Sequence, residues 1–232
     1  MVYAVGHRGA AGVRPENTLA GFRYAIDLGV DYVECDVHLS RDDHLVVMHD
    51  DAVDRTTDGT GAIRDLDFSK IRALDAGDGE QVPTLVEVLD LVRGKVKLLC
   101  ELKGDGVEDA AVDAVKAHSM EEGVFFTSFS MERLECVRRR GEDLLIGAIL
   151  PDPKEEDIAR ALELGASGIG VHYRNLCLRQ IERAYEAGLD LRAWNPDTLR
   201  EQRAMIALGV KGVSTNRPDI LIEYLKSRKV DD

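Results

Sequence analysis

The sequence predicts a (β/α)₈ barrel, and three observations lead to this fold class. Eight short β-rich segments alternate with helical patterns along the 232 residues, an alternation that is typical of a parallel sheet. Eight strand–helix units over this length give about 29 residues per unit, close to the lower end for a (β/α)₈ barrel. The competing fold is an open doubly wound sheet, but the first strand ends in GHRGAAG, which lacks the G-x-G-x-x-G spacing of that fold's phosphate loop.

The predicted strands are short segments rich in apolar and β-branched residues. In chain order they cover residues 3–9, 32–39, 97–103, 123–130, 144–150, 168–173, 189–195 and 209–216. Amphipathic helical periodicity predicts helices in the segments 18–29, 84–94, 106–118, 154–165, 177–188 and 198–209. Four of these helices end in a common stop signal, a glycine, at Gly29, Gly165, Gly188 and Gly209.

One segment interrupts this alternation. Residues 50–82 are polar, rich in glycine and aspartate, and poor in strand-forming residues. We expect an excursion after the second strand whose site-facing side forms a lid or loop over one end of the barrel. No linker or low-complexity run indicates a second domain, so residues 1–232 are expected to form one catalytic barrel domain.

The charge balance restricts the classes of partner. The 43 acidic residues outnumber the 30 basic residues, which gives a formal net charge of −13. Such a surface repels nucleic acid and anionic membranes, so we expect neither nucleic acid binding nor stable membrane association. An anionic substrate would have to be held by a metal ion or by a few local cations.

Cellular location follows from three further observations. The first residues lack the basic start and apolar core of a secretory signal, and no apolar run is long enough to span a bilayer. The four cysteines have scattered spacings, and Cys35 and Cys100 lie inside apolar strand patterns, as small buried thiols do. We therefore expect a cytoplasmic protein.

An acidic cluster is the first candidate site. In the segment 32–39, Glu34 and Asp36 alternate with apolar residues and so share one face of a strand. Glu101 lies near the end of the next strand, and catalytic groups of such barrels come from strand ends. Three converging carboxylates are costly to ionise unless a cation lies between them, and oxygen ligands favour Mg²⁺ or Ca²⁺. Structural salt bridges to Arg or Lys are the alternative.

Histidines near this cluster are candidates for proton transfer. His7 ends the first strand and His49 ends the apolar run LVVMH, and an imidazole titrates near neutral pH. His38 shares the acidic face of its strand as a further ligand or a supporting group. His172 ends its strand, and we expect it to face the barrel mouth. A purely structural role is the alternative for each of them.

Basic and aromatic residues complete the candidate pocket. Arg8 and Lys103 lie beside the acids, where they can bind a phosphate or neutralise the carboxylates. Trp194, the only tryptophan, shares a strand face with Arg192 and either walls the pocket or packs in the core. In the PENT stretch, Asn17 or Thr18 caps the following helix, or Asn17 instead points into the site.

These motifs together resemble the glycerophosphodiester phosphodiesterase family. Residues 6–22, GHRGAAGVRPENTLAGF, are similar to the family's HRG and PENT signatures, and residues 33–61 are similar to its E-x-D strand, H-D step and R-T-T-x-G-x-G loop. VPTLVEVL, CELK, AWNPD and GVSTNRPD follow in the family's order over nearly the whole chain. Two motifs depart from the family: W-T-x-N reads Trp194-Asn195-Pro196-Asp197, and T-D-R-P reads Thr215-Asn216-Arg217-Pro218.

The resemblance implies a barrel enzyme that hydrolyses small glycerophosphodiesters to glycerol 3-phosphate and an alcohol. The resemblance implies that His7 and His49 are the acid/base pair, that Glu34, Asp36 and Glu101 are ligands of a divalent metal, Mg²⁺ or Ca²⁺, and that Arg8 and Lys103 contact the phosphate. One alternative is a lipid-directed relative, a lysophospholipase D or a phospholipase C-like enzyme, which would need an exposed apolar rim. Another is a barrel that binds phosphate esters without turnover and would need neither histidine.

Overall fold

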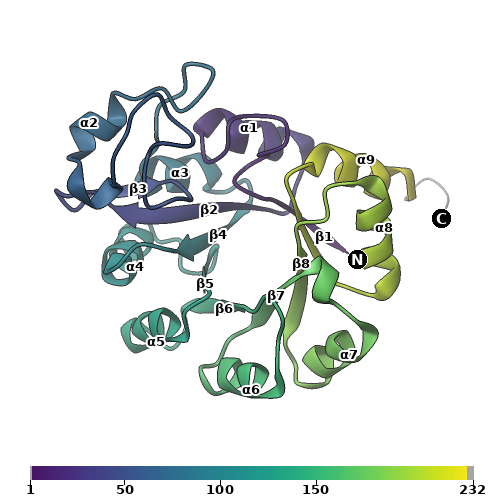
Figure 1. Ribbon diagram of the computed structural model, residues 1–232. Helices are drawn as coiled ribbons and strands as arrows, with labels where there is room; N and C mark the ends of the chain where they lie inside the picture. Colours follow the sequence, from purple (N-terminus) through teal and green to yellow (C-terminus); the bar gives the residue numbers. More distant parts are fainter. Residues whose placement is uncertain (1, 229–232) are drawn as a thin grey trace.

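The structure, a computed structural model that describes residues 2–228, confirms the predicted barrel (Figure 1). Eight parallel strands form its wall: β1 (Tyr3–Gly6), β2 (Tyr32–Leu39), β4 (Lys97–Leu102), β5 (Val124–Ser128), β6 (Leu145–Ile149), β7 (Gly168–His172), β8 (Asp190–Trp194) and β9 (Gly212–Thr215). Strand β1 pairs with both β2 and β9, so the sheet closes on itself. All eight predicted strand segments therefore contain a barrel strand.

Helices cover the outside of the barrel, as Figure 1 shows. They are α1 (Leu19–Leu28), α3 (Leu85–Val92), α4 (Val107–Ala117), α5 (Met131–Arg140), α6 (Glu155–Glu163), α7 (Leu178–Glu186), α8 (Leu199–Leu208) and α9 (Pro218–Arg228). Helices α5 and α9 add to the six that periodicity predicts. Helix α5 has a weak apolar pattern, since Leu134 and Val137 are its buried residues among many charged ones. A short 3₁₀ turn, η2 (Tyr173–Asn175), follows β7.

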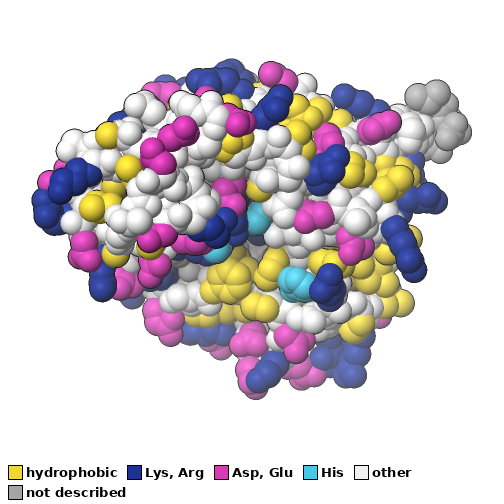
Figure 2. Space-filling model, turned by 45° about the horizontal axis from the view of Figure 1, so that its top comes forward, with side chains coloured by type: hydrophobic (Ala, Val, Ile, Leu, Met, Phe, Trp, Pro, Cys, Tyr) yellow, Lys and Arg dark blue, Asp and Glu magenta, His cyan; other side chains and the backbone are white. Residues whose placement is uncertain are grey.

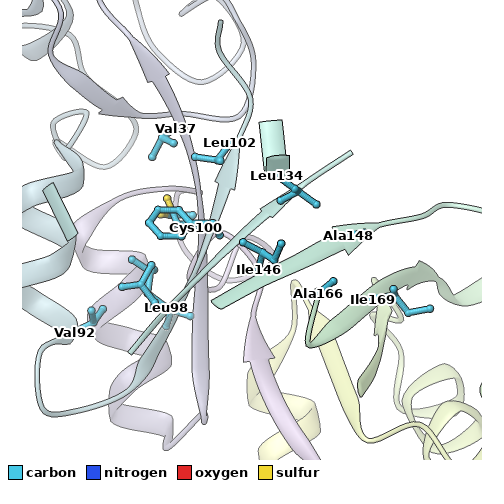
Figure 3. Packing of buried hydrophobic residues seen from close by; sticks show 14 of the residues in the cluster. Val37, Val92, Leu98, Cys100, Leu102, Leu134, Ile146, Ala148, Ala166 and Ile169 are labelled. Atoms are coloured by element: carbon cyan, nitrogen blue, oxygen red, sulfur yellow. The ribbon is translucent and has the colours of Figure 1, made fainter. Parts of the chain in front are cut away.

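The hydrophobic core lies between the barrel wall and the helices. Residues of β4, β6 and β7 that point outward from the barrel meet buried residues of the surrounding helices, as Leu98, Ile146 and Leu134 illustrate in Figure 3. Cys35 and Cys100 are buried free thiols in this layer, as predicted. No helix within residues 2–228 combines the length and apolar character needed to cross a membrane.

The excursion after β2 is more ordered than its polar composition indicates. Strand β3 (Leu45–Val47) pairs antiparallel with β2, outside the barrel. The chain then forms η1 (Ile63–Asp65) and α2 (Phe68–Arg72), which project from the β2 side of the barrel (Figure 1). Seven buried residues give this region a small apolar cluster of its own: Val46, Met48, Val53, Ile63, Ile71, Ala76 and Val82. Spaced widely along the chain, they show no local periodicity.

This small cluster generates a stability prediction. Ile71 is fully buried in it, so Ile71→Ala is expected to cost about 2–5 kcal/mol through the cavity it leaves. Hydrogen exchange should show lost amide protection over residues 48–82 while the barrel strands stay protected. The matched control is Leu162→Ala on α6, where the side chain is 39% exposed and the change should be below about 0.5 kcal/mol. Equal loss of protection in the barrel would contradict a separate cluster.

Candidate active site

Three carboxylates meet inside one end of the barrel. Glu34 and Asp36 lie on β2, and Glu101 lies on β4 directly opposite Asp36 in the parallel register. One oxygen from each of the three lies within 4.8 Å of the others, and all three side chains are buried. The alternation predicted for β2 is correct, because Val33, Cys35 and Val37 pack in the outer core layer. The group could hold a divalent cation.

The bonding of these carboxylates fits such a cation. The backbone N–H of Arg8 donates to Glu34 Oε2 at 2.8 Å, and Asn17 Nδ2 donates to Asp36 Oδ2 at 2.8 Å. The other two oxygens, Glu34 Oε1 and Asp36 Oδ1, are buried and have no hydrogen-bond partner within residues 2–228. Hard cations such as Mg²⁺ and Ca²⁺ bind oxygen atoms of this kind.

The electrostatics of the cluster lead to the same conclusion. Burial, followed by repulsion from Asp36, raises the pKa of Glu101 to about 7. Burial and the charges of Asp36 and Glu101 also raise the pKa of Glu34 well above its usual range. A cation among these oxygens would favour the ionised forms.

The HRG and PENT motifs form a tight loop that positions Arg8 and Asn17, the donors to Glu34 and Asp36. Arg8 and Asn17 both adopt a left-handed backbone, with φ of 48° and 57°, and Asn17 N–H donates to the carbonyl of Arg8 at 3.0 Å. Gly9 is required between them, because its φ is 81° and a β-carbon there would lie 2.7 Å from the backbone of Gly21. Thr18 caps α1 through a hydrogen bond from Gly21 N–H. Asn17 therefore points into the site and is not the cap.

His7 is oriented by a chain of hydrogen bonds from β8 and β9. Its Nδ1 lies 2.7 Å from Asn216 Oδ1, and Asn216 Nδ2 donates to Asp197 Oδ2 at 2.8 Å. Because the amide of Asn216 is turned by Asp197, its oxygen faces the imidazole, so Nδ1 of His7 carries the proton. Nε2 then carries no proton; it lies 3.8 Å from Glu34 Oε2 and 3.4 Å from Asn195 Nδ2. Burial, with the Arg8 charge, lowers the pKa of His7 to about 4.

The other predicted histidines occupy three different environments. His49 Nδ1 pairs with Asp50 Oδ1 at 2.6 Å, and its ring lines the same pocket as His7. His38 Nε2 lies 3.1 Å from the carbonyl of His49, and His38 is not part of the cluster of Glu34, Asp36 and Glu101. The ring of His172 packs edge-on against Trp194 with 4.8 Å between centroids, and it does not line the pocket of His7.

Both predicted phosphate contacts already pair with carboxylates. Arg8 Nη1 lies 2.9 Å from Glu16 Oε1, and its Nε lies 3.4 Å from Asp36 Oδ2. Lys103 Nζ lies 3.0 Å from Glu101 Oε1 and 3.7 Å from Asp36 Oδ1. Neutralisation of the acids, the alternative role, is thus visible for both cations.

A pocket of about 90 Å³ connects these groups. His7, Arg8, Glu34, His49 and Glu101 form its polar side, whereas its other side is formed by Phe129, Ile149, Arg192, Trp194, Asn195 and Ser214. Figure 2 shows a cleft where histidine, basic and acidic side chains meet, with hydrophobic side chains along one edge.

Sequence reasoning missed several residues that support this site. Asn195, Asp197 and Asn216 are the positions where the two family motifs depart. Asp197 and Asn216 bond to each other, and Asn195 Nδ2 lies 3.4 Å from His7 Nε2, so those departures were the available signal. Arg192 carried a weaker signal, its shared strand face with Trp194. Phe129 carried none.

Known proteins are similar to this chain over nearly its full length. The sequence profile described as "Glycerophosphoryl diester phosphodiesterase family" matches residues 7–220. A glycerophosphodiester phosphodiesterase of Caldanaerobacter subterraneus subsp. tengcongensis is 35% identical, covering 96% of this chain and 97% of the relative.

Two solved structures share the fold. The glycerophosphodiester phosphodiesterase of Agrobacterium tumefaciens is 31% identical with a TM-score of 0.83, covering 96% of this chain and 100% of that one. An Oleispira antarctica phosphodiesterase in complex with the product sn-glycerol-3-phosphate is 26% identical with a TM-score of 0.88. The match covers 96% of this chain and 95% of that one. With the barrel and the match over residues 7–220, these similarities establish that the chain belongs to the glycerophosphoryl diester phosphodiesterase family.

Proposed function

We propose that this protein hydrolyses small phosphodiesters of glycerol to glycerol 3-phosphate and a free alcohol. One observation carries the proposal: the buried carboxylate cluster lies at a pocket that His7 and His49 also line. Within residues 2–228, two of the carboxylate oxygens accept no hydrogen bond. Nδ1 of each histidine is held by a side-chain oxygen, from Asn216 and Asp50 respectively. The product named for the Oleispira antarctica structure supports this choice of product.

Glu34, Asp36 and Glu101 would hold a divalent cation, Mg²⁺ or Ca²⁺. When bound, such a cation supplies Lewis-acid stabilisation of the charge on a phosphate oxygen. Arg8 and Lys103 keep the carboxylates ionised and ordered through their ion pairs, and N–H groups not used in those pairs contact the phosphate.

Proton transfer belongs to His7 and His49. His7 carries its proton on Nδ1, so its Nε2 can accept a proton from the nucleophile, which is water or the 2-hydroxyl of the substrate. His49 bonds Asp50 through Nδ1, which leaves its Nε2 to give a proton to the leaving alkoxide. A water nucleophile yields the products in one displacement, whereas the 2-hydroxyl yields a cyclic phosphate that water then opens.

Lipid-directed hydrolysis is a second candidate, favoured by one observation. Phe129, which lines the pocket, is 50% exposed, and Leu178 and Leu199, the first residues of α7 and α8, are 53% and 43% exposed. We propose that segment 50–82 walls the opposite, polar side of the mouth. A panel of glycerophosphocholine and lysophosphatidylcholine separates the two candidates, and absence of product from both would support a binding protein without turnover.

Removing either proposed proton-transfer group should abolish most activity. His7→Ala and His49→Ala are each expected to lower kcat on glycerophosphocholine about 100- to 10,000-fold, measured as glycerol 3-phosphate released. His44→Ala is the control, because its half-exposed side chain lies away from the pocket. Full activity in either variant would refute the role given to that histidine.

Metal removal tests the carboxylate cluster. EDTA should abolish hydrolysis, and added Mg²⁺ or Ca²⁺ should restore it. Asp36→Asn should weaken cation binding in calorimetry at least about 100-fold, whereas Glu163→Gln on the far end of α6 should leave it unchanged. Undiminished activity in EDTA, or equal affinity in the two variants, would remove the metal from the mechanism.

The contact between Asp197 and Asn216 predicts a rescue. Asn216→Asp alone would place two carboxylates 2.8 Å apart, so it should lower both kcat and the melting temperature. Asp197→Asn with Asn216→Asp exchanges the two groups and restores one donor and one acceptor facing each other. A double-mutant cycle on kcat should therefore give a coupling of about 1–3 kcal/mol. Additive losses would show that the pair does not position His7.

A further inference from the structure

Arg192 is a buried cation at the floor of the active-site pocket. It lies on β8 and faces the barrel interior, with a residue exposure of 8%. Its partners in the register on the neighbouring strands are both glycines, Gly170 on β7 and Gly212 on β9. Arg192 lines the pocket and also a cavity of about 200 Å³ on its other side, bounded by Tyr3, Phe125 and other residues. The guanidinium therefore separates the pocket from the opposite end of the barrel.

This guanidinium has no protein partner within residues 2–228. Its Nε is buried without a hydrogen bond, and in that range no carboxylate oxygen lies within 4.0 Å of its nitrogens. Arg8, the other arginine of the pocket, is paired with Glu16 and Asp36. Burying an unpaired charge is costly, so such a charge indicates a ligand or water that compensates it.

A second donor without a hydrogen-bond partner lies beside Arg192. Trp194 Nε1, two residues along β8, is also buried and has no hydrogen-bond partner among the described residues. A β-carbon built on Gly170 would lie 3.0 Å from Arg192 Nη2 and 3.6 Å from Trp194 Nε1. The side chains of Arg192 and Trp194 therefore pack closely over Gly170, and any side chain at this position would push against them. The two N–H groups cannot satisfy each other because both are donors, so an acceptor oxygen in the pocket beside them would satisfy both.

We propose that Arg192, together with Trp194 Nε1, binds a phosphate oxygen of the substrate and of glycerol 3-phosphate. This inference rests on the proposed function and adds a phosphate-binding residue to it. A full positive charge favours an oxyanion over a neutral hydroxyl, and a guanidinium matches phosphate geometry. Arg8 and Lys103 form ion pairs with carboxylates, whereas Arg192 forms none within residues 2–228.

Two variants test the site in different ways. Arg192→Met removes the charge and keeps most of the side-chain volume, and Gly170→Ala keeps the charge but pushes a methyl group against Arg192 Nη2 and the Trp194 ring, which displaces both donors. Calorimetry with glycerol 3-phosphate and with inorganic phosphate, in the same Mg²⁺ buffer, should show each ligand bound about 10- to 100-fold more weakly by each variant. Glycerol affinity should change less than about twofold, and Arg192→Lys should recover part of the loss.

The control is Arg183→Met, which removes an arginine from α7 that pairs with Glu155 away from the pocket. Phosphate affinity in Arg192→Met equal to that of the control would overturn the proposal, as would an equal loss of glycerol affinity. If Arg192→Met fails to fold, unchanged phosphate binding by Gly170→Ala overturns it instead. Glycerophosphocholine hydrolysis by the unmodified protein is measured in a separate assay. If phosphate binding depends on Arg192 but no hydrolysis is found, the proposed function is refuted and the phosphate-binding role of Arg192 stands.

Discussion

Repulsion among three buried carboxylates is the constraint on which the rest of this site depends. Glu34, Asp36 and Glu101 offer oxygens within 4.8 Å of one another in a water-poor barrel end, an arrangement that is unfavourable without positive charge. The closed barrel imposes it, because the strands β2 and β4 are neighbours and end at the same rim. Arg8 and Lys103 partly compensate this charge, but within residues 2–228 Glu34 Oε1 and Asp36 Oδ1 accept no hydrogen bond. The cluster therefore adds local negative charge to a protein that is already acidic overall.

The two motif departures are explained by a contact between strand ends. Asp197 follows β8 and Asn216 follows β9, so they are distant in sequence and adjacent in the barrel. Where the family patterns have an amide at position 197 and a carboxylate at position 216, this chain has the reverse. The exchange keeps one donor and one acceptor face to face, and the residue next to His7 still accepts its Nδ1–H. The departures at positions 197 and 216 therefore place a neutral amide beside His7 and a carboxylate one contact further away.

Sequence reasoning succeeded where the structure follows from local alternation. The inward faces of β2 and β4, the glycines that end helices α1 and α8, and the buried thiols Cys35 and Cys100 are all properties of short stretches. It failed where a contact depends on the register of separate strands. The apolar cluster around Ile71 and the packing of Arg192 and Trp194 over Gly170 involve residues that no single periodicity connects. The sequence also did not decide whether Asn17 or Thr18 caps α1.

The inner surface of the barrel is uneven, and this determines how deep the site can be. Barrels of this class usually fill their interior with branched side chains, but β6, β7 and β9 present Gly147, Gly168, Gly170 and Gly212 to it. A β-carbon at Gly212 would lie 2.2 Å from the ring of Tyr3, so part of this space is taken by an aromatic ring from β1. Arg192 takes the adjoining part and leaves a cavity beside it. The glycines of β7 and β9 next to Arg192 therefore leave room for its long side chain, which lines both the active-site pocket and this cavity.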